Sequence, residues 1–191
     1  PDPFNLVIFP ENHDTSRLYS YLNEDLDLFK TAMVYMATMR GIPQFYYGSE
    51  ILMTSPRERD DGAVRADMPG GWQGDEKNAF TGKGLTAKER DMQNYVKRLL
   101  NWRKTAEVIH SGKLQHFSPV DGFYVYVRYV DNKAVMVILN KNTEAREIKL
   151  EPYSEFIKNK KKSINVMTGK AIKLGGTLKV PAKTSLIIEF Q

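Results

Sequence analysis

The feature that most constrains the fold is a short apolar run followed at once by a group of polar side chains. Leu6 to Phe9 are all apolar, which predicts a strand buried on both faces. Pro10 cannot donate a hydrogen bond to a sheet, so the strand is predicted to stop there. The polar group that follows contains Asn12, His13, Asp14 and Arg17. Polar residues at the carboxyl end of a buried strand are typical of α/β active sites, so we expect a strand, a functional loop and then a helix.

A helix and a second strand are expected next. Asn23-Glu24-Asp25 has the composition of a cap and an acidic first turn. Gly41 and Pro43 are predicted to end the helix, and Gln44 to Tyr47 is predicted to be a short strand. The apolar stripe of the helix, at helical spacing, consists of Leu22, Leu26, Phe29, Met33 and Met36.

Three motifs in the first 72 residues resemble the α-amylase family of glycoside hydrolases. Phe9-Pro10-Glu11-Asn12-His13-Asp14 is similar to the end of the family's seventh barrel strand. The segment from Gly41 to Glu50 resembles the eighth strand, and the segment from Asp61 to Trp72 resembles a loop of the cyclomaltodextrinase and neopullulanase branch. Their order along the chain is also that of the family. The resemblance implies the last two βα units of a TIM (β/α)8 barrel.

The segment 51–85 has no periodic pattern, because glycine, proline and charged residues interrupt it throughout. A loop of this length inside a compact domain usually signals function or disorder. Trp72 and Phe80 favour a partly ordered lid, since apolar rings are difficult to keep soluble on a free loop. Thr86-Ala87-Lys88-Glu89 is a capping box that predicts a helix ending at about Lys104.

The second part of the chain reads as all-β. We place the boundary near Ser111-Gly112, which gives residues 1–110 as the C-terminal part of the barrel and residues 111–191 as a separate domain. Gly175-Gly176 is a hairpin signal. Short strands with no helical pattern predict an antiparallel β-sandwich, and the amylase family carries such a domain after its barrel. The expected strands are 114–117, 123–130, 134–139, 146–150, 163–167, 171–174, 177–180 and 185–190.

The resemblance gives roles to the residues of the first motif. It implies that Asp14 is the carboxylate that stabilises the transition state, the alternative being an acid that satisfies backbone amides in a turn. It implies that His13 contacts the substrate sugar, and Asn12 is expected to bind substrate beside it. Arg17 is expected either to pair with Asp14 or an upstream carboxylate, or to be a surface residue at the start of a helix.

The second and third motifs supply further substrate-binding candidates. Tyr46, Tyr47 and Trp72 are candidates to stack on glucose rings, whose apolar faces suit aromatic surfaces. Because Tyr46 and Tyr47 are expected on opposite faces of a strand, only one of them is predicted near the substrate, and Tyr46 is the choice. Arg65 and Asp67 are expected either to bind sugar or to pin the loop.

Composition limits the partners. The net charge of +5 is divided unevenly: residues 1–110 carry 14 basic and 16 acidic residues, a net of −2, and residues 111–191 carry 14 and 7, a net of +7. We interpret the cluster Lys158, Lys160, Lys161 and Lys162 as a solvated hairpin tip, not a nucleic-acid surface. The longest apolar run, Ala134 to Leu139, is too short to span a bilayer.

Neither a metal nor a cofactor is expected. The chain has no cysteine, and no histidine or carboxylate cluster has metal-ligand spacing. The adjacent acids Asp60 and Asp61 are a possible pair of ligands for a hard cation, but adjacent acids usually face water. The chain begins without methionine a few residues before a buried strand, so we expect a piece of a longer protein, with a homo-oligomer through the truncated barrel edge as a further expectation. The resemblance favours a periplasmic or secreted location.

The predicted function follows from the resemblance. The parent protein would hydrolyse α-1,4-glucosidic bonds of cyclodextrins, pullulan or maltooligosaccharides with retention. In the family the nucleophile and general acid lie upstream of the first motif, so the 191-residue chain alone is predicted to be inactive. One alternative is another member of the family, either a transglycosylase or a sucrose-acting enzyme. A second is a non-catalytic carbohydrate-binding module with an aromatic platform of Phe123, Tyr124, Tyr126 and Tyr129, although their alternation along one strand fits a core better.

Overall fold

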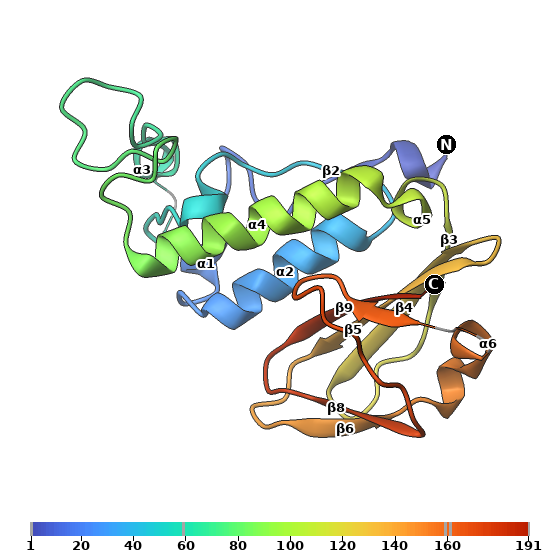
Figure 1. Ribbon diagram of the computed structural model, residues 1–191. Helices are drawn as coiled ribbons and strands as arrows, with labels where there is room; N and C mark the ends of the chain where they lie inside the picture. The colour runs from blue at the N-terminus through green and yellow to red at the C-terminus, as the bar shows by residue number, and fades with distance from the viewer. Residues whose placement is uncertain (1, 59, 159, 161, 191) are drawn as a thin grey trace. The chain divides into compact units, whose positions relative to one another are not determined.

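The computed structural model describes residues 2–58, 60–158, 160 and 162–190 (Figure 1). The chain forms two compact units. The first consists of Pro1–Met36 with Gly41–Arg98, and the second consists of Ala37–Arg40 with Leu99–Gln191. No helix in the described ranges is both long and apolar enough to cross a membrane. Lys161, which belongs to the predicted lysine cluster, lies outside the described residues.

The first unit contains a two-stranded parallel sheet. A 3₁₀ turn, η1 (Pro3–Asn5), precedes β1 (Val7–Ile8), which pairs with β2 (Ile42–Pro43). The amides of Ile42 and Gln44 donate to the carbonyls of Leu6 and Ile8 at 2.8 and 2.9 Å. Pro43 is tolerated in this strand because the residues on either side of it supply the hydrogen bonds to β1.

Two predictions for these strands are wrong. Leu6 and Val7 are each 53% exposed and Phe9 is 48% exposed, so β1 is not buried on both faces. In the part of the chain that the structure describes, β1 pairs only with β2, and most of its surface therefore lacks a packing partner. The second strand lies at Ile42–Pro43 and not at Gln44 to Tyr47, because β1 ends at Ile8 and offers no further carbonyl to the later residues.

Four helices begin in the first unit: α1 (Leu18–Tyr21), α2 (Leu26–Thr38), α3 (Asp61–Val64) and α4 (Ala87–Thr105). All of them except α1 start with a local side-chain cap. The Asp25 carboxylate accepts from the amides of Asp27 and Leu28, both at 3.1 Å, which caps α2 as the acidic turn predicted. The predicted capping box is confirmed, since Glu89 N donates to Thr86 Oγ1 at 3.2 Å and Thr86 N donates to Glu89 Oε2 at 2.7 Å.

The segment 51–85 is a long loop, as predicted, in whose described residues α3 forms a single helical turn. It follows η2 (Ser49–Ile51) and has a small apolar core of its own. That core consists of the buried residues Ile51, Ala79 and Leu85, against which Met53 and Met68 pack. The loop is therefore anchored, although neither of its large rings, Trp72 and Phe80, is buried.

The second unit is an antiparallel β-sandwich. After α5 (Glu107–His110), a five-stranded sheet has the order β3-β4-β5-β9-β7, and a two-stranded sheet pairs β6 with β8 (Figure 1). The strands are β3 (Lys113–His116), β4 (Phe123–Val130), β5 (Lys133–Asn140), β6 (Arg146–Lys149), β7 (Ser163–Asn165), β8 (Thr177–Val180) and β9 (Ser185–Phe190). Helical turns η3 (Glu151–Tyr153) and α6 (Ser154–Ile157), which the sequence pattern did not predict, follow β6.

The sandwich core draws on both sheets. Alternate residues of β4, β5 and β9 point into it and meet Ile148 of β6 and Val180 of β8. The predicted strand 171–174 is wrong, since only Ala171 forms a bridge, to Ile164. The Gly175-Gly176 hairpin is also wrong, because β8 pairs with β6 and the Gly176 carbonyl accepts from Leu150 N at 3.0 Å.

The opposite face of the five-stranded sheet buries an arginine. Arg128 of β4 is fully buried and donates to the main-chain carbonyls of Thr38, Ile109 and Gly112 at 2.9–3.0 Å. Thr38 ends α2, and Ile109 lies in the last turn of α5, so the guanidinium faces carbonyls that carry the negative end of a helix dipole. Burial lowers the pKa of Arg128 to about 10.

Candidate functional site

The loop after β1 is organised by Asn12. Its Oδ1 accepts from the amide of Asp14 at 2.8 Å, and its amide donates to Thr15 Oγ1 at 3.0 Å. The carbonyl of Asn12 also accepts from Thr15 N at 3.3 Å, which closes a tight turn. Asn12, predicted to bind substrate, therefore uses its side-chain oxygen to shape the loop that presents His13 and Asp14.

His13 and Asp14 lie side by side and open to solvent. Their side chains are 62% and 52% exposed, and His13 Nε2 lies 3.3 Å from Asp14 Oδ2. They follow β1 by a few residues, at its carboxyl end, which is where barrel enzymes place their reacting groups. Both side chains are thus accessible to a ligand from outside.

Arg65 holds this pair from the distant third motif. Its Nη2 donates to Asp14 Oδ1 at 3.1 Å, and its Nε donates to the His13 carbonyl at 3.1 Å. The same Nη2 reaches Asp61 Oδ2, one turn earlier in α3, at 3.4 Å. Of the two expectations for Arg65, the geometry agrees with pinning the loop: one guanidinium joins the 61–65 segment to the 13–14 turn.

Arg17 is buried and does not pair with Asp14. It is 1% exposed, so it is not a surface residue, and Asp14 is bound by Arg65. The expected pairing of Arg17 with an upstream carboxylate stays a prediction. The Nη1 of Arg17 donates to the carbonyl of Tyr47, and its guanidinium carbon lies 4.2 Å from the centre of the Tyr46 ring. Nε and Nη2 are buried and have no hydrogen-bond partner among the described residues.

Tyr46 and Tyr47 do not lie on opposite faces of a strand. They belong to the turn after β2, and their ring centres are 4.6 Å apart. The Tyr47 hydroxyl donates to the Ala66 carbonyl at 2.9 Å, a second tie to the segment after α3. Burial and the Tyr47 hydroxyl raise the pKa of Tyr46 and outweigh the opposing effect of Arg17.

Glu11 is a structural carboxylate to which the sequence alone assigned no role. It is 2% exposed; its Oε2 accepts from Leu18 N at 2.7 Å, and its Oε1 accepts from the Ser49 hydroxyl. It therefore joins the loop after β1, the start of α1 and the turn after β2. Its place directly after Pro10 and just before the first helix could have indicated this role, because free backbone amides at the start of a helix stabilise an acid there.

Asp67 and Trp72 lie beyond this group. The Asp67 side chain is exposed and makes no hydrogen bond or ion pair with any described residue. Trp72 is 68% exposed, and its amide donates to Asp75 Oδ2 at 3.1 Å. The structure thus brings His13, Asp14 and Arg65 together, packs Arg17 against Tyr46 and Tyr47, and leaves Asp67 and Trp72 on the outer loop.

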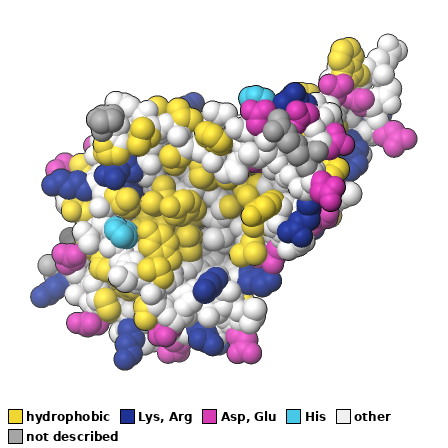
Figure 2. Space-filling view, turned by 180° about the vertical axis from the view of Figure 1, so that it is seen from behind, with side chains coloured by type: hydrophobic (Ala, Val, Ile, Leu, Met, Phe, Trp, Pro, Cys, Tyr) yellow, Lys and Arg dark blue, Asp and Glu magenta, His cyan; other side chains and the backbone are white. Residues whose placement is uncertain are grey.

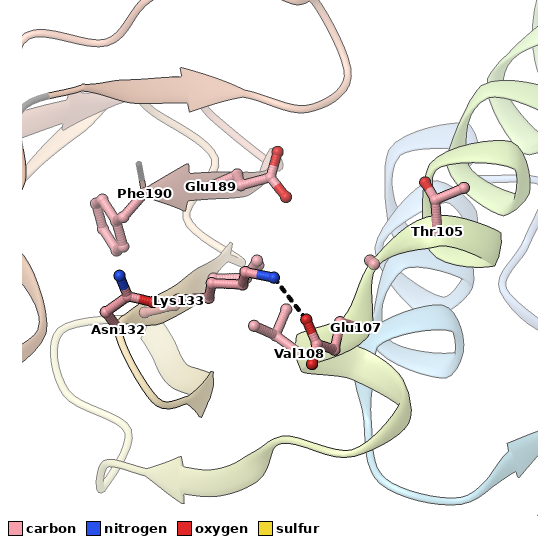
Figure 3. Close-up of a pocket in the computed structure, with 10 residues that line it drawn as sticks. Thr105, Glu107, Val108, Asn132, Lys133, Glu189 and Phe190 are labelled. Atoms are coloured by element: carbon pink, nitrogen blue, oxygen red, sulfur yellow. Dashed lines mark hydrogen bonds and ion pairs between the residues drawn. The ribbon is translucent and has the colours of Figure 1, made fainter.

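Two cavities lie away from these residues. One of about 410 Å³ lies in the second unit, where Lys133 Nζ and Glu107 Oε2 are 2.6 Å apart and Asn132 and Glu189 lie nearby (Figure 3). A polar cavity of about 470 Å³ in the first unit is lined by Ser20, Asn23, Glu24, Thr54, Ser55 and Arg57. Within the described ranges, no group of three or more His, Asp or Glu side chains could hold a metal ion.

Charge is mixed on the face that Figure 2 displays. Lys and Arg side chains stand there among Asp and Glu, not in one continuous basic field. A continuous basic surface would be the electrostatic footprint of a nucleic-acid-binding protein. The absence of a nucleic-acid partner stays a prediction of the sequence.

Two family models match the chain. The alpha amylase catalytic domain matches residues 3–106, and the cyclo-malto-dextrinase C-terminal domain matches residues 114–189. The chain is 27% identical to the maltogenic α-amylase of Bacillus acidopullulyticus, over 98% of this chain and 29% of that protein. It is 29% identical to the cyclomaltodextrinase of Geobacillus thermopakistaniensis, over 76% of this chain and 22% of that protein. The chain thus spans less than a third of either relative.

A solved α-amylase structure has the same fold as this chain. The crystal structure of the Geobacillus thermoleovorans α-amylase, complexed with acarbose, matches 99% of this chain and 39% of its own with a TM-score of 0.76 at 20% identity. The chain has the architecture of the last two βα units of a TIM barrel followed by an antiparallel β-sandwich. Since the catalytic-domain model alone matches more than half of its residues, the chain belongs to the α-amylase family of glycoside hydrolases.

Proposed function

We propose that the chain is the C-terminal portion of a retaining α-glucan hydrolase that cleaves α-1,4-glucosidic bonds of cyclodextrins, pullulan or maltooligosaccharides. The observation that carries the proposal is the exposed pair of His13 and Asp14 at the carboxyl end of β1, with Arg65 bound to the carboxylate. The names of the relatives, a maltogenic α-amylase and a cyclomaltodextrinase, support the substrate class.

In this proposal Asp14 acts on the transition state. Glycoside hydrolysis passes through an oxocarbenium-like sugar ring, which carries more positive charge than the bound substrate does. A carboxylate beside that ring binds the transition state more tightly than the ground state and so lowers the barrier. Arg65 fixes one oxygen of Asp14, and His13 adds a ring nitrogen that is able to bond to a sugar hydroxyl.

The proposal places the nucleophile and the general acid outside these 191 residues. Hydrolysis with retention needs two carboxyl groups about 5–5.5 Å apart, on either side of the bond that is cleaved. The other carboxylate of the loop, Glu11, is buried and already accepts from Leu18 N and Ser49 Oγ. Asp61 shares Arg65 with Asp14 and lies outside the loop. Glu11 and Asp61 are thus already engaged in hydrogen bonds or ion pairs, which supports a nucleophile and a general acid supplied from elsewhere.

A binding module is the weaker candidate. Its four-ring platform required Phe123, Tyr124, Tyr126 and Tyr129 to be exposed together. Phe123 is 3% exposed and belongs to the sandwich core, and Tyr126 is fully buried with its hydroxyl against Thr38 Oγ1 at 2.5 Å. Two of the four rings therefore cannot stack on a sugar.

The test has two parts. The purified 191-residue chain, incubated with maltotriose, cyclodextrin and pullulan, should give no turnover, and clear turnover would refute the assignment of the catalytic pair to a missing part. In the intact protein that carries this chain, Asp14→Asn keeps the shape of the side chain but removes its charge, so kcat should fall by roughly 10²–10⁴.

The control for this variant is Asp91→Asn, an exposed carboxylate of α4, which should leave kcat unchanged. A near-normal kcat for Asp14→Asn would make Asp14 a structural residue. Product analysis in the same assay separates hydrolysis from transfer to a second sugar, the outcome expected of a transglycosylase.

A further inference from the structure

The loop that carries His13 and Asp14 lies between two buried ionisable side chains. Glu11 is 2% exposed and Arg17 is 1% exposed, whereas His13 and Asp14 between them are exposed. Burying an ionisable group costs free energy that hydrogen bonds or opposite charges must offset, so acids and arginines are seldom buried. The two ends of this loop therefore carry a cost that a surface loop ordinarily avoids.

Glu11 joins the two ends of the loop. Its Oε2 accepts from the amide of Leu18, the first residue of α1, at 2.7 Å. The bond links positions seven residues apart in the sequence and closes the loop at its base. The separation of the two ends is thus fixed by one buried carboxylate oxygen.

The other oxygen of Glu11 fixes the loop against the turn after β2. Glu11 Oε1 lies 2.5 Å from Ser49 Oγ, which in turn lies 2.6 Å from the carbonyl oxygen of Tyr46. The same carbonyl accepts from Ser49 N at 3.3 Å. Ser49 is itself buried, so these contacts are shielded from water. The start of the loop is therefore tied to a turn that has its own internal hydrogen bonds.

Arg17 ties the end of the loop to the same turn. Its Nη1 donates to the Tyr47 carbonyl at 2.5 Å, and its guanidinium carbon lies 4.2 and 4.8 Å from the ring centres of Tyr46 and Tyr47. Its main-chain amide donates to Ser55 Oγ at 2.9 Å. Both ends of the loop thus rest on one turn, the first through a carboxylate and the second through a guanidinium.

The contacts at the tip of the loop do a different job. Asn12 Oδ1 accepts from Asp14 N at 2.8 Å, a local bond that shapes the tip but does not set its place in the unit. Arg65 binds Asp14 from outside the loop, but both side chains are about half exposed, and exposed ion pairs contribute little. The buried bonds of Glu11 and Arg17 therefore determine where Asp14 lies.

We propose that Glu11 is a positioning residue, whose bonds to Leu18 and Ser49 set the place of Asp14 against the reacting sugar. This inference rests on the proposed function. A transition-state contact depends on correct placement, and a displacement of about 1 Å can cost roughly 10²-fold in rate. Glu11 touches no substrate and acts through Asp14.

The test uses the intact protein that carries this chain. Glu11→Ala removes both bonds, so kcat should fall roughly 10- to 100-fold while KM changes by less than about twofold, because the lost contact is made in the transition state. Glu11→Gln should keep kcat within about threefold. Its amide oxygen is able to accept from Leu18 N and its amide nitrogen to donate to Ser49 Oγ, which leaves the serine proton for the Tyr46 carbonyl.

Two further variants separate placement from stability. Ser49→Ala is a smaller change on the other side of the same contact and should lower kcat in the same direction. The matched control is Glu89→Ala, because Glu89 also accepts from a main-chain amide at 2.7 Å, but at the start of α4. Glu89→Ala should lower stability and leave kcat per folded molecule unchanged.

A double variant tests whether Glu11 acts through Asp14. In the Asp14→Asn background, Glu11→Ala should lower kcat by less than about twofold more, since the carboxylate that it positions is already gone. Two residues that contributed independently would instead have effects that multiply.

Hydrogen exchange followed by mass spectrometry measures placement without catalysis. The amides of residues 12–16 should exchange about tenfold faster in Glu11→Ala than in the unaltered protein, and Glu89→Ala should leave their rates unchanged. A near-normal kcat for Asp14→Asn would refute the proposed function and leave this comparison unaffected, so the two failures are distinguishable.

Three results would overturn the inference. The first is equal exchange of residues 12–16 in Glu11→Ala and Glu89→Ala. The second is a double variant whose kcat shows the full product of the two single effects. The third is a Glu11→Gln protein as impaired as Glu11→Ala, which would mean that the charge of Glu11 matters and not the bonds that it makes.

Discussion

Two apolar strands of this chain meet opposite environments. Leu6 and Val7 enter a two-stranded parallel sheet and are each 53% exposed, whereas the four residues from Val135 to Ile138 enter a five-stranded sheet and are fully buried. The two runs have the same character in sequence. They differ in the number of partners: β5 lies between β4 and β9 and over a sandwich core, while β1 pairs only with β2 in the described residues. An apolar run thus predicts a strand, but its burial depends on what packs around it.

The largest expected difference is in hydrogen exchange. The amides of β4 and β5 should exchange on the order of 10³ times more slowly than those of Leu6–Phe9, because the former open only with the sandwich as a whole. The measurement is exchange followed by mass spectrometry in dilute monomeric protein. Slower exchange at Leu6–Phe9 would mean that the two βα units form the more stable core.

Shortening one side chain in each sheet tests the difference in burial between the two strands. Ile138→Ala leaves a cavity in the sandwich core and should lower the free energy of unfolding by roughly 2–5 kcal/mol. Val7→Ala removes a half-exposed side chain and should cost less than about 0.5 kcal/mol. Chemical denaturation of both variants gives the two numbers, and equal losses would contradict the contrast in burial.

Gly41 tests how closely β1 and β2 approach. Its φ is +120°, and a Cβ would lie 2.8 Å from the Leu6 carbonyl oxygen, so Gly41→Ala should destabilise the parallel pair by about 1–3 kcal/mol. Gly176→Ala in the sandwich is the matched control, because nothing lies within 4 Å of a Cβ there. Thermal unfolding compares them. If Gly41→Ala did not destabilise the protein, the pairing of β1 with β2 would contribute nothing to its stability.

The smallest expected effect concerns Glu89 and pH. Glu89→Gln keeps the capping hydrogen bond but removes the charge paired with Lys77, and should cost about 0.5–1 kcal/mol near neutral pH. The pKa of Glu89 is lowered in the folded protein, so its contribution is complete above its ordinary value of 4.5 and is lost as pH falls through the folded pKa. Denaturation of both proteins at pH 7 and below pH 4 should show the gap closing; a constant gap would exclude the charge as its cause.

The sequence by itself determined the features that depend on neighbouring residues. The Thr86–Glu89 box and the Asp25 cap lie within one helical turn, so their donors and acceptors meet whatever the rest of the chain does. The long alternating run of β4 and its turn into β5 are local in the same sense. Three motifs in order, Phe9 to Asp14, Gly41 to Glu50 and Asp61 to Trp72, indicated the family that the two family models support.

Only the tertiary structure decided which distant groups meet. Sequence offered Arg17 as a partner of Asp14, but Arg65, 51 residues further along, binds it, while Arg17 is buried against Tyr46. Gly175-Gly176 had the composition of a hairpin, yet β8 pairs with β6. Composition and spacing determine which donors, acceptors and apolar surfaces a segment has. Which of several chemically equivalent partners it finds is fixed by the packing of segments far apart in the chain, because a side chain is satisfied by whatever lies within about 3 Å of it.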